Sequence, residues 1–151
     1  MTEELHASLD WSGLVILDEH ECYELLREQP VGRLGFVDRA EPVILPVNYA
    51  VDGRSLVFRT GQGSKLSSAL MAQPVCLEID SWDDVGHTGW SVLVKGVADA
   101  VDDETVIARL DQLPVRPWSR PDLRREWVRI MAEEVTGRRI TPDGGSDPGP
   151  E

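Results

Sequence analysis

The stretch Val57–Leu66, VFRTGQGSKL, places a short strand-like run directly before two glycines and the start of a helical pattern. Its first four residues include β-branched and aromatic side chains, which favour an extended strand. After the glycines, an apolar stripe at helical spacing runs through SKLSSALMA (64–72). The stretch therefore predicts a strand, a glycine turn and a helix N-terminus, in that order.

Further runs rich in Val, Ile and aromatic residues lie on both sides of this stretch, separated by turn formers. They are VGRLGFVD (31–38), PVILPVNYAV (42–51), SLVFRT (55–60), PVCLEIDSW (74–82) and WSVLVKGVADAV (90–101). A sixth run, Val128–Met131, fits either a strand or a helix. Successive strands with tight turns and only short helices between them favour a barrel over a βαβ fold. We therefore expect a mainly β fold, a six-stranded antiparallel barrel capped by short helices.

Two amphipathic helices are predicted beside these strands. In the segment 17–30, Asp18 precedes Glu21 by three positions, apolar residues share one face, and Pro30 ends the pattern. The segment DDETVIARLDQL (102–113) has acidic residues in its first turn and an apolar face that includes Leu110.

The bulk properties indicate one soluble domain. The chain has 151 residues, 41% of them apolar, and we assign the domain to residues 1–140, with 1–12 as an N-terminal extension. Residues 141–151 are expected to form a disordered tail. The net charge of −12 disfavours nucleic acid and anionic membranes as partners. Without signal-peptide features or a long apolar run, a cytoplasmic location is expected.

The loop after the strand at 55–60 has the character of an anion site. A helix N-terminus offers unpaired backbone N–H groups and the positive end of a dipole. Arg59 and Lys65 add two cations, and Thr60 and Ser64 add two hydroxyls. The glycine spacing fits neither a Walker loop nor a dinucleotide fingerprint. The residues alone leave two interpretations open, a phosphate site or a tight turn whose cations balance an acidic chain.

The runs VGRLGF, PVILPVNYAVDG, LVFRTGQGSKL, VCLEIDSW, GWSVLVKGVADAV and VTGRRI, in this order over about Leu17–Ile140, resemble the pyridoxamine 5'-phosphate oxidase-like family. The resemblance implies an FMN-binding split β-barrel of Greek-key type, a homodimer with two FMN molecules between its subunits. It also implies that Arg59, Thr60, Ser64 and Lys65 hold the FMN phosphate. The isoalloxazine would lie beside one strand, at Pro46, Val47, Asn48 and Tyr49.

The same resemblance implies contacts from other segments. Phe58 and Trp90 would offer aromatic surface near the flavin ring, and Ser91 would hydrogen-bond the flavin or its phosphate. For Trp118 the residue itself leaves two interpretations open, stacking on a planar substrate and packing in the core or a dimer interface. For Arg138–Arg139 two interpretations stay open, closure over the cofactor or an anionic substrate, and a patch of surface charge.

The C-terminal run of the oxidases proper contains a histidine, whereas this chain ends its last motif in VTGRRI. Pyridoxamine phosphate is therefore not the expected substrate, and we expect an FMN-dependent oxidoreductase acting on a small planar compound. One alternative is a deazaflavin-dependent reductase of quinones, bilins or nitroaromatics. Another is a non-catalytic flavin or haem binding or sensing protein. No histidine has a motif-spaced nucleophile, so no catalytic residue is assigned, and no metal site is expected.

Overall fold

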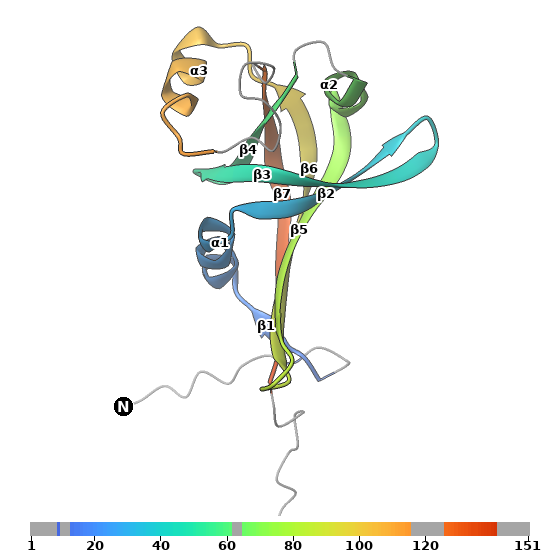
Figure 1. Cartoon of the computed structure of the whole chain (residues 1–151), viewed down its shortest axis with the longest axis vertical. Helices are drawn as coiled ribbons and strands as arrows, with labels where there is room; N and C mark the ends of the chain where they lie inside the picture. The colour runs from blue at the N-terminus through green and yellow to red at the C-terminus, as the bar shows by residue number, and fades with distance from the viewer. Residues whose placement is uncertain (1–8, 10–12, 62–64, 116–125, 142–151) are drawn as a thin grey trace, which may run out of the picture.

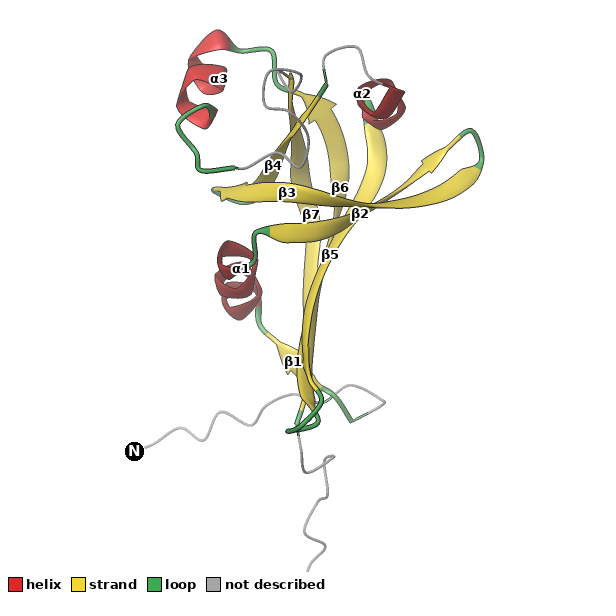
Figure 2. Cartoon of the chain, in the orientation of Figure 1, coloured by secondary structure: helices red, strands yellow, loops and turns green. Residues whose placement is uncertain are grey.

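The computed structural model describes residues 9, 13–61, 65–115 and 126–141 (Figure 1). Most of the expected N-terminal extension and C-terminal tail lies outside these residues. The described chain is mainly β, as expected (Figure 2). Its strands are β1 (Val15–Leu17), β2 (Val31–Asp38), β3 (Glu41–Asp52), β4 (Ser55–Thr60), β5 (Gln73–Asp83), β6 (Thr88–Ala100) and β7 (Glu126–Ile140), and its helices are α1 (Glu19–Glu28), α2 (Lys65–Leu70) and α3 (Glu104–Leu110).

Six of these strands close into an antiparallel barrel. The hydrogen-bonded order is β2, β3, β4, β7, β6 and β5, and β5 pairs back with β2. The connection from β4 through α2 to β5 passes β3 and β2, which is a Greek-key step. The run around Val128 belongs to β7, which decides between the strand and the helix that the sequence had left open. The additional three-residue β1 was not expected; it pairs with the last part of β7 at Leu17↔Gly137.

The fifteen-residue β7 pairs with three other strands. It pairs with β6 along most of its length, with β4 near its start, and with β1 near its end. The β6–β7 register shifts between Lys95 and Gly96. A Cβ atom added at Gly96 would lie 2.0 Å from the Met131 carbonyl oxygen, so this close approach requires glycine.

Alternate residues of the strands fill the barrel. Leu34, Leu77 and Val94 are completely buried in this core. Helix α1 packs against this core with Cys22 and Leu26. The helix begins with the expected cap, in which the Asp18 carboxylate accepts a hydrogen bond from the Glu21 N–H at 2.8 Å. Burial raises the pKa of the Cys22 thiol to about 11, which keeps this cysteine protonated and unreactive.

Helix α3 lies on the outer face of β4 and β7 rather than over an end of the barrel, where the sequence led us to expect it (Figure 1). Leu110 packs with Val57 and Trp127 in a second cluster of buried residues, separate from the barrel core. Val57 and Trp127 alternate with core residues, so their side chains leave the sheet outward and need cover. An outward apolar pair on neighbouring strands explains why α3 packs there.

An ion-pair network also anchors α3. Arg109 bonds both carboxylate oxygens of Asp52, at 2.6 and 3.1 Å, and Arg129 bonds the same carboxylate at 2.8 Å. The hydrogen bond from Arg109, supported by Arg129 and opposed by partial burial, lowers the pKa of Asp52 from 3.8 to about 2. The network therefore ties the helix to the β3–β4 turn, where Gly53 has a φ of +61°.

Replacing Asp52 by Asn is expected to lower the free energy of unfolding at pH 7 by about 1–2 kcal/mol, because the variant keeps the shape but loses the charge-assisted bonds. The pKa of Asp52 is depressed in the folded state, so its stabilisation is complete above about pH 4 and disappears as the pH falls toward 2. Urea unfolding at pH 7 and pH 2.5 measures this, with the exposed Asp102→Asn as control. A difference between Asp52→Asn and wild type that is equally large at both pH values would contradict the assignment.

Candidate functional site

The described residues confirm the order of elements predicted around the glycine loop. Strand β4 ends at Thr60, Gly61 follows it, and α2 begins at Lys65. Ser64 and the side chain of Lys65 lie outside the described part of the chain. Two of the four residues expected at a phosphate, Arg59 and Thr60, are therefore positioned by the end of β4.

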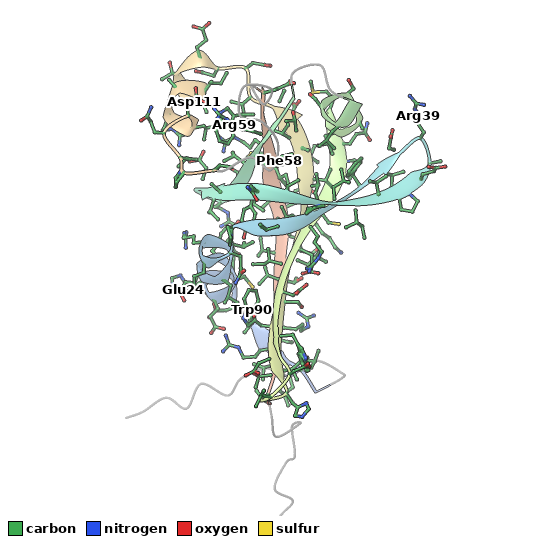
Figure 3. The ribbon with its side chains drawn as sticks, viewed as in Figure 1. Glu24, Arg39, Phe58, Arg59, Trp90 and Asp111 are labelled. Carbon is green, nitrogen blue, oxygen red and sulfur yellow. The ribbon has the colours of Figure 1, made fainter. Side chains whose placement is uncertain are left out.

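Arg59 points to the outer face of the barrel, where its side chain is 24% exposed. Its guanidinium carbon lies 4.6 Å from the centre of the Trp127 ring, within the range of a cation–π contact. Its Nη2 bonds Asp111 Oδ1, which also accepts from Trp127 Nε1 at 2.8 Å. Figure 3 shows Arg59 and Asp111 together beside α3. The cation is thus held between the barrel and the C-terminal end of α3.

Thr60 points to the opposite face of β4 and is 1% exposed. Its Oγ1 has no hydrogen-bond partner among the described residues. The neighbouring Ser67 donates to Glu126 Oε2 at 2.8 Å, and Glu126 is the cross-strand partner of Thr60. A buried hydroxyl left without a partner costs free energy, so Thr60 is suited to donate to an oxyanion at the end of β4.

The four β3 residues expected beside a flavin ring divide between the two faces of the strand. Pro46 and Asn48 face outward, whereas Val47 and Tyr49 are each 5% exposed and belong to the core. The Tyr49 hydroxyl donates to the Leu26 carbonyl at 2.6 Å, and burial raises its pKa. A ligand outside the barrel would therefore meet the side chains of Pro46 and Asn48 but only the backbone of the other two.

The expectation that Phe58 offers aromatic surface is wrong for this structure. Phe58 is 1% exposed and packs in the barrel core. It precedes the outward Arg59, and successive residues of a strand point to opposite faces. Its ring therefore stabilises the core and does not reach a ligand on the outer face.

Asn48 and Arg59 come together on that outer face. Asn48 precedes Tyr49 and Arg59 follows Phe58, the register pair of these antiparallel strands, so both side chains leave the sheet on the side that carries α3. A cavity of about 480 Å³ lies here, lined by Asn48, the C-terminal end of α1 and the residues Pro114 and Val115. The cavity combines the Asn48 amide with apolar side chains, elements of a small-molecule site, and Arg59 is not among its lining residues.

A second group of predicted residues gathers elsewhere. In the β6–β7 register, Trp90 lies opposite Arg139 and Ser91 lies opposite Arg138. One cavity of about 370 Å³ is lined by Trp90 and Arg139, and another of about 220 Å³ is lined by Trp90, Ser91 and Arg138. Trp118 lies outside the described residues.

The two groups lie at opposite ends of β7. Arg59 pairs with Trp127 and Trp90 pairs with Arg139, and the segment from 127 to 139 is roughly 40 Å of extended strand. Figure 3 shows Arg59 beside α3 and Trp90 toward the other end of the molecule, close to β1. This separation exceeds the length of an FMN molecule, so a single flavin cannot contact both groups of one chain.

Three charged residues that the sequence did not assign to a site form a network on the outer face. Arg33 Nη1 lies 2.5 Å from Asp80 Oδ2 and 3.5 Å from Glu78 Oε1. Arg33 is also the register partner of Pro46. Partial burial, and then the neighbouring Asp80, raises the pKa of Glu78 to about 7. A carboxyl group that titrates near neutral pH can exchange a proton with a ligand on this face.

Sequence reasoning missed this network because its members come from two strands far apart in the chain. The available signal was a charged residue within each of two strand-like runs, VGRLGFVD and PVCLEIDSW. Within the described residues, no group of His, Cys, Asp and Glu has the geometry of a metal site, and no helix is both long and apolar enough to span a membrane.

The closed ring of six antiparallel strands with a Greek-key crossing, short helices and the strand–glycine–helix step at the end of β4 define a split β-barrel protein. The sequence profile of the family described as pyridoxamine 5'-phosphate oxidase matches residues 18–139. The chain belongs to that family.

Individual relatives cover most of the chain. The FAD binding protein from Mycobacterium smegmatis is 36% identical, with a TM-score of 0.71, over 83% of this chain and 97% of that one. A putative pyridoxamine 5'-phosphate oxidase from Corynebacterium glutamicum is also 36% identical, with a TM-score of 0.75, over 85% and 98%. An uncharacterized protein of Mycobacterium tuberculosis is 38% identical over 136 residues, 86% of this chain and 88% of that protein.

Proposed function

We propose that the chain binds a flavin on the outer face of β3 and β4, and that it acts as a flavin-dependent oxidoreductase on a small planar compound. The observation that carries this proposal is the end of β4. It presents Arg59 on one face and, on the other, the buried Thr60 hydroxyl with no partner among the described residues, directly before the glycine loop. Arg59 suits the phosphate of FMN on the outer face, whereas Thr60, on the opposite face, would reach the same phosphate only beyond the end of β4.

The proposed site is completed by a second copy of the chain. The group around Arg59 and the group around Trp90 are too far apart to contact one flavin within one subunit. In a two-fold dimer, the Arg59 end of one subunit can face the Trp90 end of the other, and symmetry produces two equivalent sites. A homodimer with two flavins between its subunits therefore accounts for both groups of residues.

The bound flavin supplies hydride and electron transfer. The protein's own residues bind and orient it, with the phosphate at Arg59 and Thr60 and the ring beside Pro46 and Asn48. The carboxyl group of Glu78, whose pKa is raised to about 7, lies on the face that carries Pro46 and can hold or release a proton. These roles need no nucleophilic side chain.

We propose FMN as the cofactor because the side chains at the end of β4 suit a ribityl phosphate. FAD contains the same phosphate as part of its diphosphate, and the 36% identical protein of Mycobacterium smegmatis is described as FAD binding. The residues at the end of β4 suit either flavin. FMN and FAD differ only in the adenylate part, so contacts to that part would decide between the two cofactors.

The test is the identity of the chromophore that co-purifies with the protein. We expect a yellow protein with flavin absorption bands, whose released cofactor co-elutes with FMN. Co-elution with FAD would correct the cofactor but keep the flavin site. A colourless protein that cannot be loaded with FMN or FAD, and that reduces substrates only with a deazaflavin, would overturn the proposal. Haem absorption without flavin would do so as well.

A further inference from the structure

Asp111 occupies the position where an anion would meet Arg59. One oxygen of its carboxylate, Oδ1, accepts from both Arg59 Nη2 and Trp127 Nε1. Asp111 is also the C-cap of α3, the residue directly after its last turn, and its backbone N–H donates to the Ile107 carbonyl at 2.9 Å. Asp111 and the residues after it are called the α3 end below. The proposed phosphate-binding cation is therefore already paired with a carboxylate of the same chain.

A phosphate that bonds the Arg59 guanidinium would lie within a few ångströms of that carboxylate. Like charges at such distances repel, and because the Asp111 side chain is 42% exposed and that of Arg59 24%, water and salt screen this repulsion in part. The phosphate and Asp111 therefore favour different arrangements of one guanidinium. Binding of the phosphate should weaken the contact of Asp111 with Arg59 and Trp127.

We propose that Asp111 is a built-in competitor for the phosphate of the ligand at Arg59, so that phosphate binding and docking of the α3 end oppose each other. This inference rests on the proposed function, because the phosphate concerned is that of the flavin. Coupling of this kind is reciprocal, so whatever affinity Asp111 removes from the phosphate, the phosphate removes from the docking of the α3 end.

The rest of α3 should stay in place when Asp111 is released. Leu110 remains packed with Val57 and Trp127, and Arg109 remains bonded to Asp52. The conformational change should therefore be confined to Asp111 and the two residues that follow it, 111–113, whose backbone N–H groups bond the carbonyls of Ile107, Arg109 and Leu110. Hydrogen exchange can detect this change, because only the backbone amides of that segment should exchange faster when phosphate binds.

The experiment compares Asp111→Asn with wild type, using FMN, riboflavin and inorganic phosphate as ligands. The asparagine keeps an oxygen that can accept from Arg59 and Trp127 but has no charge. We expect Asp111→Asn to bind FMN about three- to tenfold more tightly at low ionic strength, with a smaller difference at high salt. Riboflavin, which has no phosphate, should bind both proteins equally. Glu104→Gln is the matched control, since it removes the same charge from the other end of α3.

Tightening for FMN but not riboflavin in Asp111→Asn alone, with faster exchange of segment 111–113 when wild type binds phosphate, would support the inference. Unchanged or weaker FMN binding by Asp111→Asn would overturn it and leave the proposed function intact. Equal tightening by Glu104→Gln would also overturn it, because the effect would then come from net charge. Failure of every folded variant to bind FMN or FAD would overturn the proposed function and this inference together. Hydrogen exchange of the wild-type protein with and without phosphate requires no variant, so this measurement still tests the inference if Asp111→Asn is unstable.

Discussion

The double variant Arg59→Ala, Lys65→Ala is expected to bind FMN about two to four orders of magnitude more weakly than wild type. Each charge-assisted contact to a phosphate contributes about 1.5–3 kcal/mol, and a tenfold change in affinity corresponds to about 1.4 kcal/mol. The two substitutions leave the Thr60 hydroxyl and the backbone of the glycine loop in place. Flavin titration followed by fluorescence measures the loss.

The control for this variant must separate charge from fold. Arg54→Ala, Lys95→Ala removes one arginine and one lysine from exposed positions that pair with Glu19 and Glu134, and it should keep wild-type affinity. Alanine at Arg59 also removes the contact with Trp127, so binding is measured well below the midpoint of thermal unfolding. Wild-type FMN affinity in a folded Arg59→Ala, Lys65→Ala variant would exclude the phosphate assignment.

The strands could be predicted from the sequence because their signals are local. The run VGRLGFVD lies between Pro30 and a turn, and β2 spans the same residues, 31–38. The cap at Asp18 likewise predicts where α1 begins. β1 was missed because three residues give no alternation to detect, and it is stabilised by pairing with β7, more than a hundred residues later.

Positions that depend on packing between distant segments could not be predicted. The amphipathic pattern of 102–113 predicts a helix but not the surface it covers. That surface is set by Val57 and Trp127, which become neighbours of the helix only after β4 pairs with β7. The contact of Asp111 with Arg59 follows from the same packing, so it has no counterpart in the local sequence.

The candidate site was predicted as a set of residues but not as an arrangement. Asn48 and Arg59 share a face as a cofactor site would require, whereas Phe58 is turned into the core by strand alternation. Trp90 and Ser91 meet Arg138–Arg139 as neighbours, but at the far end of β7. A resemblance between sequences names the residues of a site and does not say which subunit supplies each of them.

Mixing two inactive variants is therefore expected to restore flavin binding. Arg59→Ala, Lys65→Ala removes the cations at one end of β7, and Arg138→Ala, Arg139→Ala removes those at the other end. If each site takes one end from each subunit, a dimer that contains one chain of each kind has one fully intact site and one that lacks both pairs. Neither variant alone has an intact site.

After the two variants are unfolded, mixed in equal amounts and refolded together, half of the dimers are mixed, and about one quarter of all sites should bind FMN with wild-type affinity. Titration of the mixture should show this fraction as a tight class of sites, and each variant refolded alone should show none. Wild type refolded in the same way controls for recovery. If the mixture binds no more FMN than the average of the separate variants, both ends must act within one chain or the C-terminal pair must lie outside the site. Because the two pairs lie roughly 40 Å of strand apart, the first of these outcomes would require β7 to leave the extended conformation, which the β6–β7 pairing along it opposes.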